Sequence, residues 1–245
     1  MDIVTSRQNS VFKAFIAAKK DKAAMLLEGR RLVEDALSRG MIPEMAAVTA
    51  EYIAANGPLP CRFTLFSEDL LSRITDTVTP QGVVAFFPIP WAKFTDILVC
   101  EKVLVLDSLQ DPGNMGTIIR TAEAFGFQAV IITGETVSPF SPKAVRASMG
   151  SCLGVCIAKA DLSDLKTLPH RIISLVTQGD TLLKPDLFQG KVALCLGREG
   201  TGLSREILDI CHCRVSIPMK GPTESLNVAI AAGIVMACAC GVYNQ

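Results

Sequence analysis

The chain contains 245 residues, of which 49% are hydrophobic and 20% are charged, and its 24 basic side chains balance its 24 acidic ones. That length suits one large domain or two modest ones, each able to bury a hydrophobic core. The composition excludes a disordered or fibrous chain, and the balanced charge argues against a protein that coats nucleic acid through bulk positive charge.

The amino terminus and the cysteines indicate the compartment. The first twenty residues include Asp2, Arg7 and Lys13 and no uninterrupted apolar run, so no secretory signal is visible. The longest apolar stretch, 228–242, is shorter than the roughly 17–25 residues that span a bilayer, which predicts a buried helix. Nine cysteines without regular spacing predict reduced thiols. We therefore expect a cytoplasmic protein that does not enter a membrane.

Two cysteine groups near the carboxyl end raise the question of a metal site. They are Cys211-His212-Cys213 and Cys238-Ala239-Cys240. Structural zinc sites prefer Cys pairs separated more widely than these, so we expect no metal. The chain has only two histidines, His170 and His212, which leaves little material for a His-based catalytic triad.

The first part of the chain is predicted to be a small α/β domain with a basic amino-terminal end. The first forty residues are predicted to be helical: Asn9 or Ser10 caps a first helix, and a second helix ends at Gly40. Strand-like segments follow at 45–49, 62–66 and 83–87, and a helix capped by Ser67 runs to about Ile74. The first forty residues contain eight basic and five acidic side chains. After Pro88-Ile89-Pro90, we interpret residues 93–101 as a linker between domains of residues 1–92 and 102–245.

From Lys102 onwards, short apolar strands alternate with helices. The predicted strands are 103–106, 129–133, 155–158, 171–176, 192–196 and 214–217, and the helices include 117–125, 143–151, 205–209 and a last one from about Leu226. Nearly continuous apolar strands are typical of a parallel sheet covered on both faces. Ligands of such α/β domains bind beyond the carboxyl ends of the strands, so the loops there are candidate sites.

Three loops at strand ends are rich in glycine or polar residues. In the first, Asn114 and Gly116 lie where a helix begins, and Arg120 is expected one turn further, where the helix dipole favours a nearby phosphate or carboxylate. The alternative interpretation is that Arg120 is a surface residue without a ligand and that Asn114 only caps the helix. The second loop, 196–204, has three glycines but neither a phosphate-binding nor a dinucleotide fingerprint, which favours backbone contacts to an adenine or ribose.

The third loop, 217–227, leads into the apolar helix. Ser225 or Thr223 could cap that helix. Asn227 stands at the head of an apolar run, where an unpaired amide is costly to bury, so we expect it to have a defined partner in the protein or in a ligand.

These loops, in this order, closely resemble the SpoU (TrmH-like) family of RNA ribose 2′-O-methyltransferases, part of the knotted methyltransferase superfamily. The matching strings are Asn114-x-Gly116-x-x-x-Arg120-Thr-Ala, Leu196-Gly-Arg-Glu-Gly200-x-Gly-Leu203, and Ile217-Pro-Met219 with Ser225-Leu-Asn227-Val-Ala229. The segments Leu27-Glu28-Gly29 and Asp76–Gly82 resemble the ribosomal-protein-L30-like (L30e-like) substrate domain that often precedes the catalytic domain.

The resemblance implies a parallel α/β fold with a trefoil knot, S-adenosylmethionine as methyl donor, and a homodimer for which the terminal helix is a candidate surface. It implies a cofactor site of Leu196, Gly197, Glu199, Gly200, Ile217, Pro218, Met219, Ser225, Leu226 and Asn227. It also implies a catalytic set of Asn114, Arg120, Glu199, Ser225 and Asn227. Arg120 would take the proton of the ribose hydroxyl or, because arginine is ordinarily always charged, stabilise the developing alkoxide or hold a phosphate.

The L30-like domain favours ribosomal RNA, most simply 23S, over transfer RNA. The candidate RNA contacts are Arg7, Lys19, Lys20, Lys22, Arg30 and Arg31. A non-catalytic RNA-binding assembly factor is expected to have lost Asn114, Arg120 or Asn227, and all three are present. An oxidoreductase is excluded because the loop after strand 103–106 lacks the dinucleotide fingerprint. The pattern leaves the modified nucleotide open.

Overall fold

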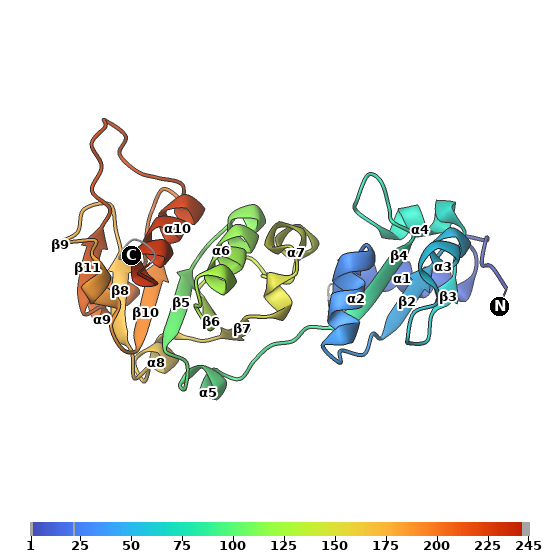
Figure 1. The fold of residues 1–245 in the computed structure, drawn as a ribbon, viewed down its shortest axis with the longest axis horizontal. Helices are drawn as coiled ribbons and strands as arrows, with labels where there is room; N and C mark the ends of the chain where they lie inside the picture. Colours follow the sequence, from blue (N-terminus) through green and yellow to red (C-terminus); the bar gives the residue numbers. More distant parts are fainter. Residues whose placement is uncertain (1, 22, 242–245) are drawn as a thin grey trace. The chain divides into compact units, whose positions relative to one another are not determined.

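The computed structural model describes residues 2–21 and 23–241. It consists of two compact units, and the chain passes from the first to the second between Ile89 and Pro90 (Figure 1). Each unit has its own sheet.

The amino-terminal unit is built on a four-stranded mixed sheet in the order β1-β4-β2-β3. Strands β1 (Ala24–Glu28) and β2 (Met45–Val48) pair antiparallel with the central β4 (Val83–Pro88), and β3 (Thr64–Leu65) pairs parallel with β2. The helices are α1 (Ser10–Asp21), α2 (Arg30–Ser38), α3 (Ala50–Asn56) and α4 (Glu68–Ile74).

Aromatic packing joins α1 to this sheet. Phe12 and Phe15 lie one helical turn apart on α1, and both are buried. The ring centroid of Phe15 lies 5.1 Å from that of Phe66 and 5.9 Å from that of Phe86, in edge-to-face geometry. Asn9 begins the helix by accepting a hydrogen bond from the Val11 amide at 2.8 Å, as one of the two predicted caps.

Two elements of this unit were not predicted. The residues of β1 include Ala, Met, Leu and Glu, which favour helix, and the segment was grouped with a helical region. The segment forms a strand because residues 25–28 are all buried where they pair with β4. Helix α3 is capped by Thr49, whose side chain accepts from the Tyr52 amide, and it ends at Gly57.

The carboxyl-terminal unit contains a seven-stranded, entirely parallel sheet, as the sequence predicted, in the order β7-β6-β5-β10-β8-β11-β9. Its strands are β5 (Lys102–Asp107), β6 (Ala129–Thr133), β7 (Cys156–Lys159), β8 (Arg171–Leu175), β9 (Thr181–Leu182), β10 (Val192–Leu196) and β11 (Cys213–Ser216). Its helices are α5 (Phe94–Ile97), α6 (Pro112–Ala124), α7 (Pro142–Ser148), α8 (Leu162–Leu165), α9 (Arg205–Ile210) and α10 (Val228–Ala239), with short 3₁₀ turns at Ser151–Leu153 and Pro185–Phe188.

The topology of this sheet marks a candidate ligand site. Strand β10 lies between β5 and β8, with Cys195 opposite Val105 of β5. The chain leaves β5 toward β6 on one side and leaves β10 toward β11 on the other. In open α/β sheets, such a reversal beyond the carboxyl ends of neighbouring strands is where ligands bind.

Two helices begin at residues other than those predicted. Helix α6 begins at Pro112 instead of Thr117, because Asp111 caps it by accepting from the Asn114 amide at 2.8 Å and proline favours the first helical position. Arg120 is therefore the ninth residue of α6 instead of a first-turn residue, and the helix-dipole argument for it was wrong. Helix α10 begins at Val228, and its cap is Asn227 in place of Ser225 or Thr223.

Two further segments bear on the predicted organisation. Residues 93–101 contain α5, and Ile97 is fully buried in the core of the carboxyl-terminal unit. The apolar stretch near the end of the chain forms α10, which is 12 residues long. Every helix in residues 2–21 and 23–241 is too short or too polar to cross a membrane.

Candidate functional site

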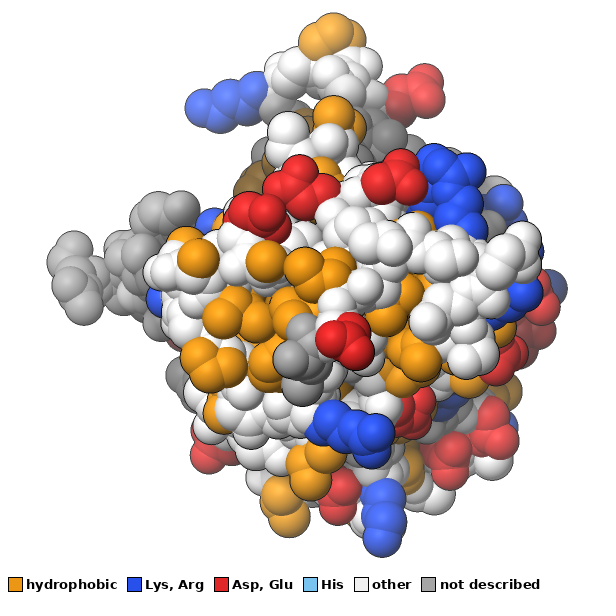
Figure 2. All heavy atoms as spheres, turned by 90° about the vertical axis from the view of Figure 1, so that its right-hand side faces the viewer, with side chains coloured by type: hydrophobic (Ala, Val, Ile, Leu, Met, Phe, Trp, Pro, Cys, Tyr) orange, Lys and Arg blue, Asp and Glu red, His pale blue; other side chains and the backbone are white. Residues whose placement is uncertain are grey.

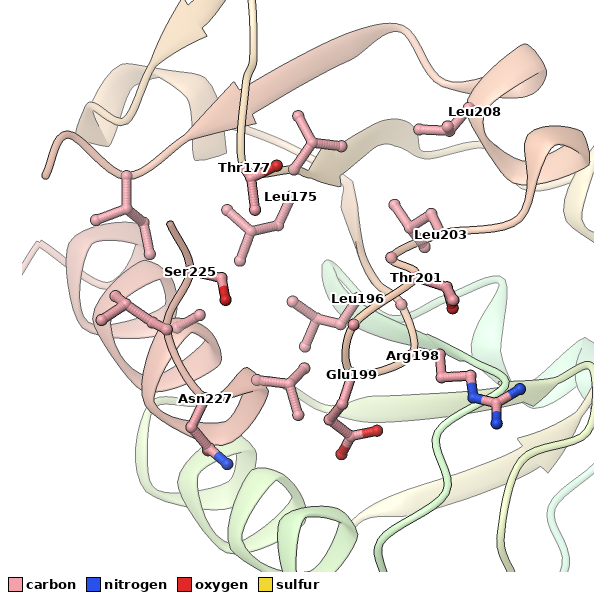
Figure 3. Close-up of a pocket in the computed structure, with 18 of the residues that line it drawn as sticks. Leu175, Thr177, Leu196, Arg198, Glu199, Thr201, Leu203, Leu208, Ser225 and Asn227 are labelled. Atoms are coloured by element: carbon pink, nitrogen blue, oxygen red, sulfur yellow. The ribbon is translucent and has the colours of Figure 1, made fainter. Parts of the chain in front are cut away.

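A cavity of about 530 Å³ opens at the carboxyl ends of β8, β10 and β11 (Figure 3). Its walls are the ends of these strands, the loops that follow them, and the first turn of α10. The volume lies in the range typical of cofactor sites. The cavity therefore lies beyond the carboxyl ends of the strands, where parallel-sheet topology predicts a ligand.

The loop after β10 is held in a tight hairpin. The Arg198 amide donates to the Gly202 carbonyl at 3.0 Å, and the Gly202 amide donates back to the Arg198 carbonyl at 2.8 Å. A Cβ on Gly197 would overlap the backbone of Gly202 and Leu203, so only glycine fits there. At the far end of the loop, the Ser204 amide donates at 2.8 Å to the buried carboxylate of Asp107, the last residue of β5.

A chain of hydrogen bonds joins the three predicted loops at the cavity. The Asn114 side-chain amide donates to Glu199 Oε1 at 2.7 Å. The Asn227 side-chain amide donates to Asn114 Oδ1 at 3.1 Å, while Asn227 Oδ1 accepts from the first amides of α10. The expectation that Asn227 has a defined partner is confirmed. Both polar ends of the Asn114 side chain are engaged, so its orientation is fixed by residues 85 and 113 positions away.

Asp111 and Lys143 support this chain from outside the cavity. Asp111 Oδ1 holds the Asn114 amide and Asp111 Oδ2 accepts from Lys143 Nζ at 2.9 Å. The Lys143 ammonium and then the Asn114 N–H lower the pKa of the Asp111 carboxyl, because both favour its charged form. Helix α7 reaches α6 closely here, since a Cβ on Gly116 would collide with the backbone of Ala144. The small residue of the first motif therefore serves helix packing.

Most of the predicted cofactor-site residues line the cavity. They are Leu196, Gly197, Glu199, Gly200, Ile217, Met219, Ser225, Leu226 and Asn227. Figure 3 shows the Ser225 hydroxyl directed into the space, with Glu199 and Asn227 at its lower edge. Pro218 does not line the cavity. Arg120 does not line it either and is exposed on α6, six residues after Asn114.

Several lining residues were not among the predicted site residues. They are Leu175, Val176, Thr177, Arg198, Thr201, Gly202, Leu203, Leu208, Val228 and Ala231. A usable signal existed for the first three, because they end or follow a predicted strand whose carboxyl end shares the sheet edge with the glycine-rich loop. Asp111 was also missed, although Asp before Pro is a strong signal for a helix start.

Neither Cys195 nor His170 lines the cavity. Burial raises the pKa of the Cys195 thiol, which therefore stays protonated within β10. Burial also lowers the pKa of His170, whose Nε2 lies 2.9 Å from the Cys100 carbonyl oxygen. Within the part of the chain that the structure describes, no three His, Cys, Asp or Glu side chains come together as metal ligands.

The predicted RNA contacts lie in the amino-terminal unit, and three of them form ion pairs. Arg7 pairs with Asp69 at 3.3 Å, Lys19 with Asp76 at 2.7 Å, and Arg30 with Glu34 at 2.8 Å. Lys20 and Arg31 are exposed. Lys22 lies outside the described residues. On the face shown in Figure 2, basic side chains occur as separate groups among acidic ones, around a hydrophobic centre.

The two segments that suggested an L30-like domain meet in this unit. The buried Glu28 carboxylate accepts from the amides of Asp76 and Thr77, at 2.8 and 3.2 Å. The Gln81 side chain accepts from the Arg30 amide at 3.0 Å. Arg30, Arg31 and Gln81 line a second, open hollow of about 580 Å³ beside α2. The loop 75–82 and the start of α2 thus form one polar surface.

Comparison with known proteins decides the family. The model of the SpoU rRNA Methylase family matches residues 101–237, which is more than half of the chain. The chain belongs to the SpoU rRNA methylase family. The model of the MRM3-like substrate binding domain matches residues 18–85. The SpoU fold implies a knot in the carboxyl-terminal unit, an exception to the usual rules of chain connection.

Relatives match this chain over nearly its whole length. The 23S rRNA (guanosine(2553)-2′-O)-methyltransferase RlmP of Bacillus subtilis is 31% identical over 96% of this chain and 98% of its own length. An uncharacterized tRNA/rRNA methyltransferase of Synechocystis is 34% identical over 95% of this chain and 91% of its own. The AdoMet-bound rRNA methyltransferase from Sinorhizobium meliloti superimposes with a TM-score of 0.84 at 30% identity, covering 100% of this chain and 98% of its own.

Proposed function

We propose that this SpoU-family enzyme transfers the methyl group of S-adenosylmethionine to the 2′-hydroxyl of a ribose in 23S ribosomal RNA. The observation that carries the proposal is the hydrogen-bonded chain Glu199–Asn114–Asn227, which brings the three SpoU motif loops together at one cavity. These residues are far apart in sequence, so the contacts between them do not arise from local loop structure and require the three loops to be held together.

The cavity fits the cofactor. Its volume of about 530 Å³ suits a nucleoside-sized ligand, and its glycine-rich wall lets backbone groups approach an adenine or ribose. When bound, S-adenosylmethionine supplies a methyl group on a sulfonium that leaves as a neutral thioether. We assign its binding to Leu196, Gly197, Glu199, Gly200, Ile217, Met219, Ser225, Leu226 and Asn227.

The catalytic roles follow from which polar groups are already engaged. Asn114, Glu199 and Asn227 bind one another, so we assign them to holding the motif loops in register. The exposed Ser225 hydroxyl is free to contact a ligand at the cavity. We propose that Arg120 supplies positive charge to the RNA, either at the developing alkoxide or at a phosphate. Correct alignment of the hydroxyl oxygen contributes much of the acceleration in such transfers.

The choice of 23S ribosomal RNA rests on the whole length of the chain. The Bacillus subtilis relative matches both units, and the amino-terminal unit matches a substrate-binding domain. We propose that the amino-terminal unit binds RNA and that the carboxyl-terminal unit, which includes residues 93–101, carries out the methyl transfer in the cytoplasm. The exposed Lys20 and Arg31 are the strongest candidates among the predicted RNA contacts, because Arg7, Lys19 and Arg30 have acidic partners.

We also propose a homodimer through α10. Ile230 and Ile234 lie one turn apart on this helix and are 57% and 39% exposed. Two large aliphatic side chains in one exposed stripe are typical of a surface that a second copy covers. Light scattering would report a dimer for the wild type and a shift toward monomer for Ile230→Lys; an unchanged dimer would contradict this surface.

The function is tested by methyl transfer from labelled S-adenosylmethionine to unmodified 23S ribosomal RNA and, separately, to unmodified transfer RNA. Nucleosides from the product are identified by mass spectrometry. A 2′-O-methylated nucleoside from 23S RNA alone supports the proposal. Label in transfer RNA alone contradicts the substrate while keeping the reaction. Absence of both cofactor binding and transfer contradicts the enzyme function.

A further inference from the structure

Arg198 is a charged residue of the cavity wall that has no neutralising partner among the residues that the structure describes. The cavity lining contains two charged residues, Arg198 and Glu199. Glu199 Oε1 accepts from Asn114. Arg198 is exposed, and its guanidinium forms no ion pair or hydrogen bond with any residue in 2–21 or 23–241. A free guanidinium beside a ligand cavity has all five of its donors available.

The backbone that carries Arg198 is fixed. Its amide and carbonyl are both bonded to Gly202, at 3.0 and 2.8 Å, in an isolated antiparallel bridge. On one side, Gly197 is packed against the same hairpin, and on the other, Glu199 is anchored to Asn114 on α6. The base of the side chain is therefore held in place while its charged end remains free. This arrangement suits a group that binds an external partner with little backbone rearrangement.

The direction of the side chain favours the RNA over the cofactor. In Figure 3, Arg198 extends away from the interior of the cavity, on the side opposite Ser225 and Asn227. A guanidinium inside the cavity would repel the positive charge of a bound sulfonium. On the outer side of the cavity, the guanidinium can approach the negatively charged backbone of the RNA, whose ribose must reach the cavity to be methylated. The planar guanidinium matches the geometry of a phosphate, with two parallel hydrogen bonds.

We propose that Arg198 binds a backbone phosphate of the RNA strand at the mouth of the cavity and thereby positions the nucleotide to be methylated. The inference rests on the proposed function and names a positioning residue for it. Arg198 acts by holding the strand and does not take part in the transfer itself. Its contribution is therefore expected in the binding of RNA and in the salt dependence of that binding.

The test compares three variants with the wild type on an unmodified 23S ribosomal RNA transcript. Arg198→Ala removes the positive charge. Arg198→Lys keeps the charge but loses the planar guanidinium that can form two parallel hydrogen bonds to a phosphate. Arg171→Ala is the matched control, because Arg171 is exposed at the amino-terminal end of β8, the opposite edge of the same sheet. The measurements are KM for RNA, kcat, RNA binding by anisotropy across a salt series, and the Kd for S-adenosylmethionine by calorimetry.

We expect Arg198→Ala to raise KM for RNA on the order of tenfold and to reduce the slope of log affinity against log salt by about one. Arg198→Lys should restore the slope but only part of the affinity, and Arg171→Ala should match the wild type. The Kd for the cofactor should be unchanged in all three variants.

Two results would overturn the proposal. One is wild-type RNA affinity and salt slope in Arg198→Ala. The other is weaker cofactor binding in Arg198→Ala with unchanged RNA affinity, which would assign the guanidinium to the cofactor carboxylate. Failure of the proposed function itself is seen separately, in a wild-type protein that neither binds S-adenosylmethionine nor methylates RNA.

Discussion

Polar residues are used differently in the two units. In the carboxyl-terminal unit, Asn114, Glu199 and Asn227 join segments that lie 85 and 113 positions apart. In the amino-terminal unit, side chains form pairwise ion pairs: Arg30–Glu34, Arg39–Asp35 and Arg73–Asp69 join residues four positions apart, and Arg7–Asp69 and Lys19–Asp76 join different segments. Exposed ion pairs contribute little free energy.

The difference shows which polar pattern identifies a site. The basic residues among the first forty were the candidate RNA contacts, yet Arg7, Lys19, Arg30 and Arg39 each form an ion pair with an acidic side chain. The hydrogen bonds among Asn114, Glu199 and Asn227 do not stabilise any one helix. They hold three loops together at the cavity. A continuous chain of hydrogen bonds that joins three loops at one cavity therefore identifies the site more sharply than a count of charges does.

The largest effect is expected for Arg120→Ala. We expect about a thousandfold loss of kcat at saturating RNA, because the charge that this residue supplies at the alkoxide or phosphate has no substitute. The matched change in the other unit, Arg31→Ala, should raise KM for RNA a few-fold, on the scale of one exposed phosphate contact, and leave kcat unchanged. Steady-state methyl transfer measures both. Near wild-type transfer by Arg120→Ala at saturating RNA would contradict its assignment.

A somewhat smaller effect is expected for Asn114→Ala. This change removes the donor to Glu199 and the acceptor for Asn227 together, and we expect kcat to fall about a hundredfold. Asn56→Ala is the control from the amino-terminal unit, where Asn56 Oδ1 accepts from Arg30 at 2.6 Å on the surface. It should leave methyl transfer unchanged. Equal losses in the two variants would remove the distinction between the two kinds of polar contact.

Backbone packing in the glycine-rich loop gives the next prediction. Gly197→Ala places a Cβ against the backbone of Gly202 and should weaken S-adenosylmethionine binding by tenfold or more, because the hairpin must open. Gly221→Ala is the control, since nothing lies within 4 Å of a Cβ there. Calorimetry gives both Kd values. Wild-type affinity in Gly197→Ala would mean that the hairpin does not form the cofactor wall.

The smallest effect concerns pH. The pKa of Asp111 is lowered by Lys143 and by the Asn114 N–H, so its charged form stabilises the fold above the unfolded pKa of about 3.9. This contribution is lost as pH falls through the folded pKa. Asp111→Asn keeps the cap without the charge, so its Tm should be about 1–2 °C lower at neutral pH, with the gap closing toward pH 3. A gap that widens in acid would contradict this interpretation.

Much of the fold could be predicted because its signals are local. The apolar runs of β5, β6 and β10 are too continuous for surface elements, and the alternation with helices indicates a parallel sheet. The three motif loops were predicted for the same reason, since each directly follows a strand. Asn227 was expected to need a partner from its position alone, and it has one.

The remaining features depend on long-range structure. The strand order places β10 between β5 and β8 and so brings Glu199 close to Asn114. This order cannot be predicted from the local sequence of any one strand. Strand β1 consists of good helix formers that become a strand through burial beside β4. The predicted position of Arg120 in its helix was wrong because the prediction did not recognise Asp111-Pro112 as the start of that helix.

The central claim is that the Asn114–Glu199 contact acts as one unit in the site, and a double-mutant cycle tests it most directly. The kcat/KM for methyl transfer is measured for the wild type, Asn114→Ala, Glu199→Ala and the double variant. If the two residues work through their shared hydrogen bond, the double variant loses little more than the worse single variant. Strictly multiplicative losses would mean that the residues act independently and would contradict the claim.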